Sequence, residues 1–168
     1  MQVQDIMNTS VLTCRTTDSL NIPAQLMWEH DYGAIPVVSP DGRVAGIITD
    51  RDICMAAYTH GQPLTALSVE KAMSKDVFMC GPQENVVQVE KAMADMQILR
   101  VPVVDVEGHP FGMVSLSDIA MGAIRPGASE QGLAYEGIVR ALAAIIGPRG
   151  RKHRPLRPES SGSEVSVP

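Results

Sequence analysis

Two stretches of the chain carry one pattern, GIITDRDI at residues 46–53 and GMVSLSDI at residues 112–119. The match continues outward at the same offset of 66, so that residues 3–57 align with residues 69–123 without a gap. Identical pairs include Met7 with Met73, Cys14 with Cys80, Met27 with Met93 and Pro36 with Pro102. A repeat of fixed period decides architecture before any local propensity does. The sequence therefore predicts two copies of one unit, with equivalent polar residues meeting at a cleft between them.

Length and composition favour a compact protein without disulfides or bound metal. A chain of 168 residues is long enough to bury about 70% of its unfolded surface. Its three cysteines lack paired spacing, which fits a reducing compartment, and we expect Cys14 and Cys80 to be small buried apolar groups. The four histidines are scattered and predict no metal site. The ten methionines are expected to fill the core, and Trp28 is expected to pack on a helix.

The charge balance argues against a nucleic-acid-binding protein, and the hydropathy pattern argues against a secreted or membrane protein. Residues 1–148 hold 9 basic and 17 acidic side chains, a net charge of −8, and this acidic body argues against nucleic acid as the main ligand. Binding of nucleic acid or of an acidic partner through the basic tail stays open as an alternative. The first seven residues lack a secretory signal, and residues 141–146 form an apolar run far shorter than the roughly 20 residues that span a bilayer. We therefore expect a cytoplasmic protein that does not enter membranes.

Each copy is predicted to be an α/β (α+β) unit with the order strand, helix, strand, strand, helix. In the first copy, Pro23 delays the start of the first helix to about Asn21, and a turn at Asp41-Gly42 joins two strands. The predicted strands cover residues 11–13, 34–38 and 43–49 in the first copy, and residues 101–105 and 111–115 in the second.

Four segments are expected along the chain. Residues 1–66 and 67–124 hold the two copies, and residues 125–148 hold a further helix from about residue 130 to 146, with Ser129 as its cap. Residues 149–168 are basic and then rich in proline and serine, so we expect a disordered tail.

In each copy a hydroxyl ends a strand, and a carboxylate follows three residues later in the first turn of a helix. The pairs are Thr49 with Asp52 and Ser115 with Asp118. On spacing alone this pattern favours a helix capping box, with Asp in place of the usual Glu or Gln. A carboxylate can also accept hydrogen bonds from the adjacent hydroxyls of a ribose, and a helix start attracts phosphate. The spacing leaves both roles open.

The same motif has a companion upstream in both copies, IPVV at residues 35–38 and VPVV at residues 101–104. Together these motifs resemble the cystathionine-beta-synthase (CBS) domain, present twice over residues 3–124. The resemblance implies two units related by a pseudo-twofold axis and a flat, disk-like homodimer. It also implies regulatory binding of AMP, ADP, ATP or S-adenosylmethionine, with an effect on a partner protein and without catalysis or a cofactor.

The resemblance also assigns roles to single residues. Asp52 and Asp118 would bind ribose hydroxyls, while Thr49 and Ser115 would contact phosphate. Arg51 would add a positive charge in the first copy only, and Arg100 would either reach a phosphate across the cleft or be a solvated arginine. Adenine would lie among backbone and apolar groups at Thr13, Cys14, Ala34, Ile35, Pro36, Met79, Cys80, Arg100, Val101 and Pro102.

One alternative belongs to a different functional class. The chain would keep the CBS fold without a ligand and would bind another protein through its last helix and basic tail. The second copy supports this alternative, because Leu116 and Ser117 give it no positive charge where the first copy has Arg51.

Overall fold

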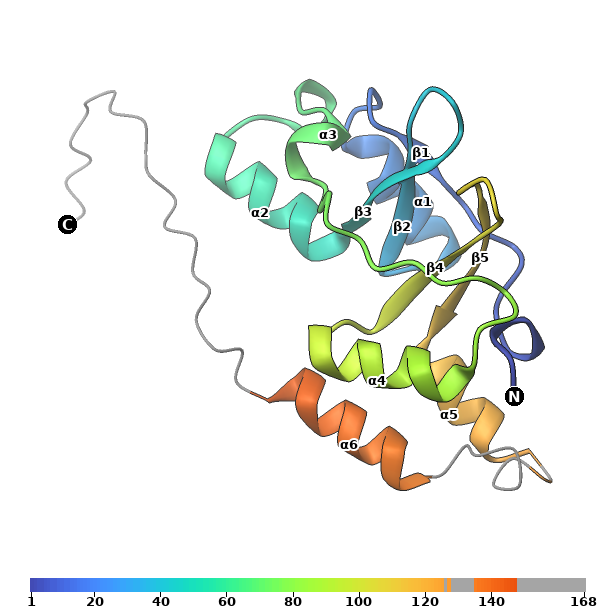
Figure 1. The fold of residues 1–168 in the computed structure, drawn as a ribbon. Helices are drawn as coiled ribbons and strands as arrows, with labels where there is room; N and C mark the ends of the chain where they lie inside the picture. The colour runs from blue at the N-terminus through green and yellow to red at the C-terminus, as the bar shows by residue number, and fades with distance from the viewer. Residues whose placement is uncertain (126, 128–134, 148–168) are drawn as a thin grey trace, which may run out of the picture.

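A computed structural model of the protein describes residues 1–125, 127 and 135–147. Two units of mixed helix and sheet lie one above the other, and a further helix lines the outer side of the second unit (Figure 1). The first unit contains a three-stranded sheet and the second a two-stranded sheet. The predicted α+β class and the tandem arrangement are confirmed.

In the first unit, β1 (Cys14–Arg15) runs parallel to β2 (Ala34–Val38), and β2 runs antiparallel to β3 (Val44–Thr49). Helices α1 (Asn21–His30) and α2 (Asp50–His60) follow β1 and β3. Helix α1 begins at Asn21 as predicted, because a proline is tolerated in the first turn, where its missing N–H is not needed. The predicted strand at residues 11–13 is wrong. Val11 N–H donates to the Thr9 carbonyl, and sheet pairing begins only at Cys14.

The second unit repeats this plan with α4 (Val86–Met96), β4 (Arg100–Val104), β5 (Pro110–Ser115) and α5 (Leu116–Ala123). These strands end within one residue of the predicted limits. A short helical turn at Val3–Asp5 precedes the first unit, and a turn at Leu64–Ala66 and helix α3 (Val69–Ala72) connect the two units. Helix α6 (Tyr135–Ile146) ends where predicted. Its expected start near residue 130, the cap at Ser129 and the tail at 149–168 lie outside the described residues.

The first segment of each repeat is buried in the hydrophobic core of the other unit. Val3 and Ile6, at the start of the first repeat, are buried in the core of the second unit. Leu67 and Val69, at the start of the second repeat, are buried in the core of the first unit. Each core is therefore completed by the segment with which the other copy begins in sequence.

The exchanged segments cross close to β3 and β5, and two glycines make room for them. Ile47 pairs with Ser74 and Met113 pairs with Asn8, positions that are related by the repeat offset. A Cβ atom on Gly46 would lie 2.8 Å from the Ser74 carbonyl oxygen, and one on Gly112 would lie 2.9 Å from the Asn8 carbonyl oxygen. Both distances are shorter than real Cβ contacts, so the crossing requires glycine at both positions.

Gly112→Ala is expected to lower the free energy of unfolding by about 1–3 kcal/mol, because the added methyl group must displace the crossing backbone. Gly46→Ala is expected to act in the same way. Gly81→Ala is the matched control, since its Cβ would meet only Glu84 Oε1, at an ordinary 3.7 Å. The urea concentration at the midpoint of unfolding is measured for all three variants. Equal midpoints for Gly112→Ala and Gly81→Ala would show that the crossing tolerates a side chain.

Two expectations about apolar side chains are corrected by the fold. Trp28 is 89% exposed on α1 and does not pack on a helix. Helix α1 buries Met27, and the next residue is rotated about 100° around the helix and points away from the sheet. Met27 and Met93 fill the cores as predicted, whereas other methionines are exposed, namely Met55, Met79, Met96 and Met121.

Helix α6 packs on α4 and α5 and completes the core of the second unit with Ala141 and Ile145. Gln97 Nε2 donates to the Ala144 carbonyl at 2.8 Å. Glu90 is buried beneath Gly137, and this burial raises the pKa of the Glu90 carboxyl above its ordinary value. In the part of the chain described here, no helix is both long and apolar enough to cross a membrane.

Candidate functional site

Both candidate carboxylates cap the helices that carry them. Thr49 N–H donates to Asp52 Oδ2 at 3.0 Å, Thr49 Oγ1 donates to the same oxygen at 2.6 Å, and Asp52 N–H donates back to Thr49 Oγ1 at 3.2 Å. Ser115 and Asp118 repeat this arrangement at 2.8, 2.6 and 3.2 Å. The capping role that the spacing favours is therefore present in both copies.

Capping uses one oxygen of each carboxylate and leaves the other oxygen available. The bonds that the two carboxylates accept all end on Oδ2, and no hydrogen bond to Oδ1 of Asp52 or Asp118 occurs among the described residues. Both side chains are only half-buried, so Oδ1 can accept hydrogen bonds from a bound molecule. In contrast, the Ser115 hydroxyl proton points at Asp118 and must turn before it can reach a phosphate.

A cavity of about 240 Å³ lies beside Asp118, between the two units. The second unit contributes Arg100 from β4 together with residues of β5 and the first turn of α5, and the first unit contributes the start of β2 and the segment before β1. Its lining is Asn8, Ser10, Val11, Leu12, Tyr32, Ala34, Pro36, Arg100, Met113, Ser115, Ser117 and Asp118. The volume is just below the roughly 300–1,000 Å³ of typical ligand pockets. The cavity can therefore enclose part of a nucleotide.

Arg100 brings the positive charge of this cavity. Its guanidinium lies across Gly33, where a Cβ atom would approach it to 3.3 Å, so it reaches from the second unit to the first. Among the described residues, Arg100 takes part in no salt bridge or side-chain hydrogen bond. The guanidinium therefore has no charged partner in the described chain, and it lines the same cavity as Ser117 and Asp118.

The predicted site residues separate into three groups. Five line the Asp118 cavity: Ala34, Pro36, Arg100, Ser115 and Asp118. Four have fully buried side chains and could meet a ligand only through their backbone: Cys14, Ile35, Cys80 and Val101. The others lie outside the lining of this cavity: Thr13, Thr49, Arg51, Asp52, Met79 and Pro102.

The two buried thiols are poor nucleophiles. Burial, with a smaller contribution from Asp18, raises the pKa of the Cys14 thiol to about 12. Burial, with a smaller contribution from Glu84, raises the pKa of the Cys80 thiol to about 12. The thiolate is the reactive form, so the packing role predicted for both residues is consistent with their surroundings.

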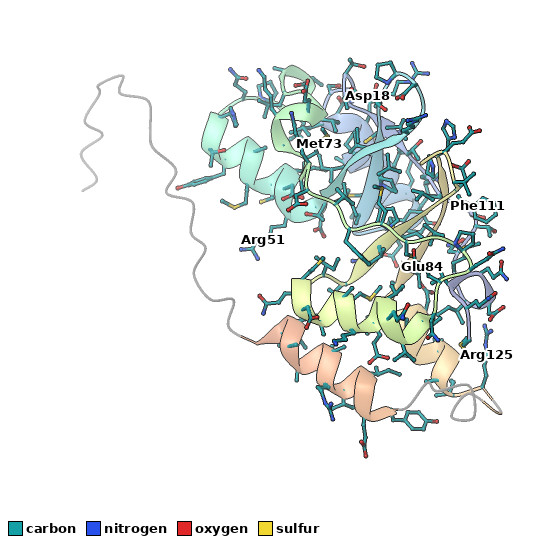
Figure 2. The ribbon with its side chains drawn as sticks, viewed as in Figure 1. Asp18, Arg51, Met73, Glu84, Phe111 and Arg125 are labelled. Atoms are coloured by element: carbon teal, nitrogen blue, oxygen red, sulfur yellow. The ribbon has the colours of Figure 1, made fainter. Side chains whose placement is uncertain are left out.

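Arg51 extends outward from the first turn of α2 in Figure 2 and is exposed. The resemblance gave Asp52 and Asp118 the same role and placed the extra charge of Arg51 beside Asp52. The cavity beside Asp118 is lined by residues of the second copy that include Arg100, and neither Asp52 nor Arg51 is among its lining residues.

Sequence reasoning missed four polar residues of the cavity. Tyr32 Oη donates to the Ser10 carbonyl at 3.3 Å and accepts from Asn8 Nδ2 at 3.4 Å, which ties the end of α1 to the segment before β1. Ser117 contributes an exposed hydroxyl. Only Ser117 had a local signal, as part of the repeated motif, because the others reach the cavity through the crossing of the segments.

The sequence profile of the family described as the CBS domain matches residues 3–58 and 69–123. The chain belongs to the CBS-domain family. Two relatives of this CBS-domain protein are similar over most of their length. The CBS domain-containing protein YhcV of Bacillus subtilis is 34% identical over 119 residues, 71% of this chain and 83% of YhcV. Hypoxic response protein 1 of Mycobacterium tuberculosis is 35% identical over 118 residues, 70% of this chain and 81% of that protein.

Two solved structures share the fold of the CBS-domain protein. The CBS domain pair of MJ0100, in complex with 5′-methylthioadenosine and S-adenosyl-L-methionine, has a TM-score of 0.65 and 28% identity, over 72% of this chain and 94% of that one. Hypoxic Response Protein I, with two coordinated zinc ions, has a TM-score of 0.66 and 30% identity, over 72% and 98%. Within the described residues of the present chain, no three His, Cys, Asp or Glu side chains are grouped to hold a metal ion.

Proposed function

We propose that this protein is a regulatory sensor of adenine nucleotides and that it binds them in the Asp118 cavity. The observation that carries the proposal is the meeting of three uncommitted polar groups in one cavity: Asp118 Oδ1, the Ser117 hydroxyl and the Arg100 guanidinium. The adenosyl compounds bound by the CBS pair of MJ0100 support the same ligand class.

The polar groups suggest how the nucleotide is oriented. Asp118 Oδ1 accepts hydrogen bonds from the ribose hydroxyls, which a carboxylate can do without changing its protonation state. The phosphate lies against Arg100 and Ser117, and the base lies among apolar groups such as Leu12, Ala34 and Pro36. The ligand therefore contacts both units at once, and its occupancy can bias the angle between them.

The positive charge of Arg100 favours adenine nucleotides, which carry phosphate, over S-adenosylmethionine, which carries a positive charge. A guanidinium binds phosphate with two parallel hydrogen bonds, whereas it repels the positively charged sulfonium of S-adenosylmethionine. Because Arg100 has no ion-pair partner within the described chain, we favour AMP, ADP or ATP over S-adenosylmethionine.

The proposed sensor acts by binding and carries out no reaction of its own. It pairs as a homodimer through its helices and transmits occupancy to a partner protein in the cytoplasm, where adenine nucleotides report the energy state of the cell. The exposed apolar side chains of α1 and α2 support an interaction surface on the first unit.

Isothermal titration calorimetry with AMP, ADP, ATP, S-adenosylmethionine and 5′-methylthioadenosine tests the function. We expect saturable heat from at least one phosphate-bearing nucleotide. Arg100→Gln is expected to weaken AMP binding about 10- to 100-fold, the scale of a hydrogen bond to a charged group. Binding of 5′-methylthioadenosine, which carries no phosphate, is expected to change much less.

Arg125→Gln is the matched control, because Arg125 Nη1 donates to the Asp5 carbonyl and Arg125 is not among the residues that line the cavity. Its AMP affinity is expected to equal that of the parent chain. If none of the five compounds gives heat, the nucleotide proposal fails and the ligand-free interaction module replaces it. If Arg100→Gln weakens AMP and 5′-methylthioadenosine equally, Arg100 does not contact phosphate.

A further inference from the structure

The first unit has an open groove between α1 and α2, with a volume of about 450 Å³. Trp28 stands exposed at its edge, and Met27 and Ile53 form part of its floor. The lining, which we call the α1–α2 groove, is Ala24, Met27, Trp28, Asp31, Tyr32, Asp50, Ile53, Cys54, Ala57 and Leu64. A largely apolar groove of this kind is unusual on a surface with no partner.

The equivalent groove of the second unit is filled by a helix. The repeat offset places Glu90 at the position of Ala24, Gln97 at that of Asp31, and Ala123 at that of Ala57. In the second unit, Glu90 lies against Gly137 of α6, and Gln97 donates to the Ala144 carbonyl of α6. The α1–α2 groove is thus the counterpart of a surface that already binds one helix.

The chain cannot fill the α1–α2 groove with its own α6 in this arrangement. Helix α6 packs on α4 and α5, and Figure 1 shows α4 lying between α6 and the first unit. The described part of the chain therefore has two grooves of one type, of which α6 fills the one on the second unit.

Helix α6 also has a second apolar face. Its inner face, with Ala141 and Ile145, is buried in the second unit. Its outer stripe, exposed by 43–73%, consists of Tyr135, Val139, Leu142 and Ile146. The spacing of four, three and four residues places these side chains in one row along the helix. None of these four side chains belongs to either hydrophobic core of the described residues.

We propose that two copies of the chain pair head to tail, so that the outer stripe of α6 in each copy occupies the α1–α2 groove of the other. Each copy then supplies one stripe and one groove, so the contact is made twice about a twofold axis and closes without further growth. Helix α6 becomes a shared middle layer between the second unit of one copy and the first unit of its partner. The proposal specifies the homodimer of the proposed function and does not depend on which nucleotide binds.

The mass of the full chain in solution, measured by light scattering on a sizing column, is the first test. We expect a dimer for the parent chain and a monomer for both Leu142→Glu and Trp28→Glu, with dissociation constants raised roughly tenfold or more. Ala143→Glu is the matched control, because Ala143 is exposed on α6 outside the stripe, and it is expected to stay dimeric. Circular dichroism establishes that each variant is folded.

A disulfide cross-link tests which surfaces meet. Cys54 lines the groove and is exposed, whereas the other two cysteines of the chain are buried. Under mild oxidation, Leu142→Cys is expected to give a covalent dimer whose linked peptides contain residues 54 and 142. Ala143→Cys is expected to give little of the corresponding product, and adding Cys54→Ser to Leu142→Cys is expected to abolish it.

Three results would overturn the proposal: a monomeric parent chain, a dimer that survives Leu142→Glu, or a dimer lost only in Trp28→Glu. The last result would mean that the α1–α2 groove pairs with itself or with another surface. Calorimetry with AMP on the same variants separates this failure from failure of the proposed function. A chain that binds AMP as a monomer refutes the dimer alone, and a dimer of the expected kind without AMP binding refutes the nucleotide alone.

Discussion

Val3→Asp is expected to unfold the second unit, although residue 3 belongs by sequence to the first repeat. Val3 is fully buried in the core that contains Val86 and Met93, and its N–H donates to the Glu84 carbonyl at 3.0 Å. Burial of a valine side chain stabilises the fold by about 1.5–3 kcal/mol. Replacing it with an unpaired buried carboxylate costs roughly a few kcal/mol more. The sum is a large part of the roughly 5–15 kcal/mol that stabilise a typical domain.

Hydrogen exchange measured by mass spectrometry locates the damage. In Val3→Asp we expect residues 86–119 to lose protection first and residues 34–49 to keep most of theirs. Gln4→Ala is the control, since Gln4 is exposed and joins Pro82 only through its backbone. Greater loss of protection in the first unit than in the second would mean that the segments do not exchange.

Asp118→Ala is expected to weaken AMP binding about 10- to 100-fold, because it removes the charged acceptor for the ribose hydroxyls. It also removes the bonds that Asp118 Oδ2 accepts from Ser115, so the free energy of unfolding is expected to fall by about 1 kcal/mol, the scale of capping interactions. The variant therefore loses affinity and stability together, and stability alone cannot identify the binding role.

Asp52→Ala separates the two effects. Asp52 caps α2 through the same set of bonds, within 0.2 Å of those at Asp118, but it is not among the residues that line the described cavity. We expect the same loss of stability with AMP affinity unchanged. Calorimetry and urea unfolding on the two variants provide the comparison. An equal loss of AMP affinity in both variants would mean that AMP does not bind in the Asp118 cavity alone. No loss of affinity in either variant would mean that both carboxylates serve only as helix caps.

Much of the local structure was predictable because it depends on neighbours in sequence. The turn at Asp41-Gly42 requires a residue that tolerates positive φ, and Gly42 has a φ of 82°. Pro23 set the start of α1, and the hydroxyl and carboxylate three residues apart set the starts of α2 and α5. The predicted strand at residues 11–13 failed because its apolar residues pack at the boundary between the units and pair with no strand.

The candidate site was predictable only in part. Asp118, Ser115 and Arg100 carried a signal, because the first two belong to the repeated motif and Arg100 precedes the repeated VPVV segment. Asn8, Ser10 and Tyr32 carried none, since they meet the cavity only after the first segment crosses to the second unit. Which of the two repeated motifs faces the described cavity was also not visible in the sequence.

The sequence by itself determined that the protein is a doubled α/β unit resembling the CBS domain, with a hydroxyl and a carboxylate three residues apart at the start of one helix in each copy. These features follow from spacing within a few residues and from the repeat offset, both of which are properties of the linear chain. The tertiary structure alone decided that the cores exchange segments, that Arg100 and Asp118 line one cavity, and that α6 covers one of two equivalent grooves. Those arrangements depend on contacts between residues far apart in sequence, where shape and burial rather than local pattern select the partner.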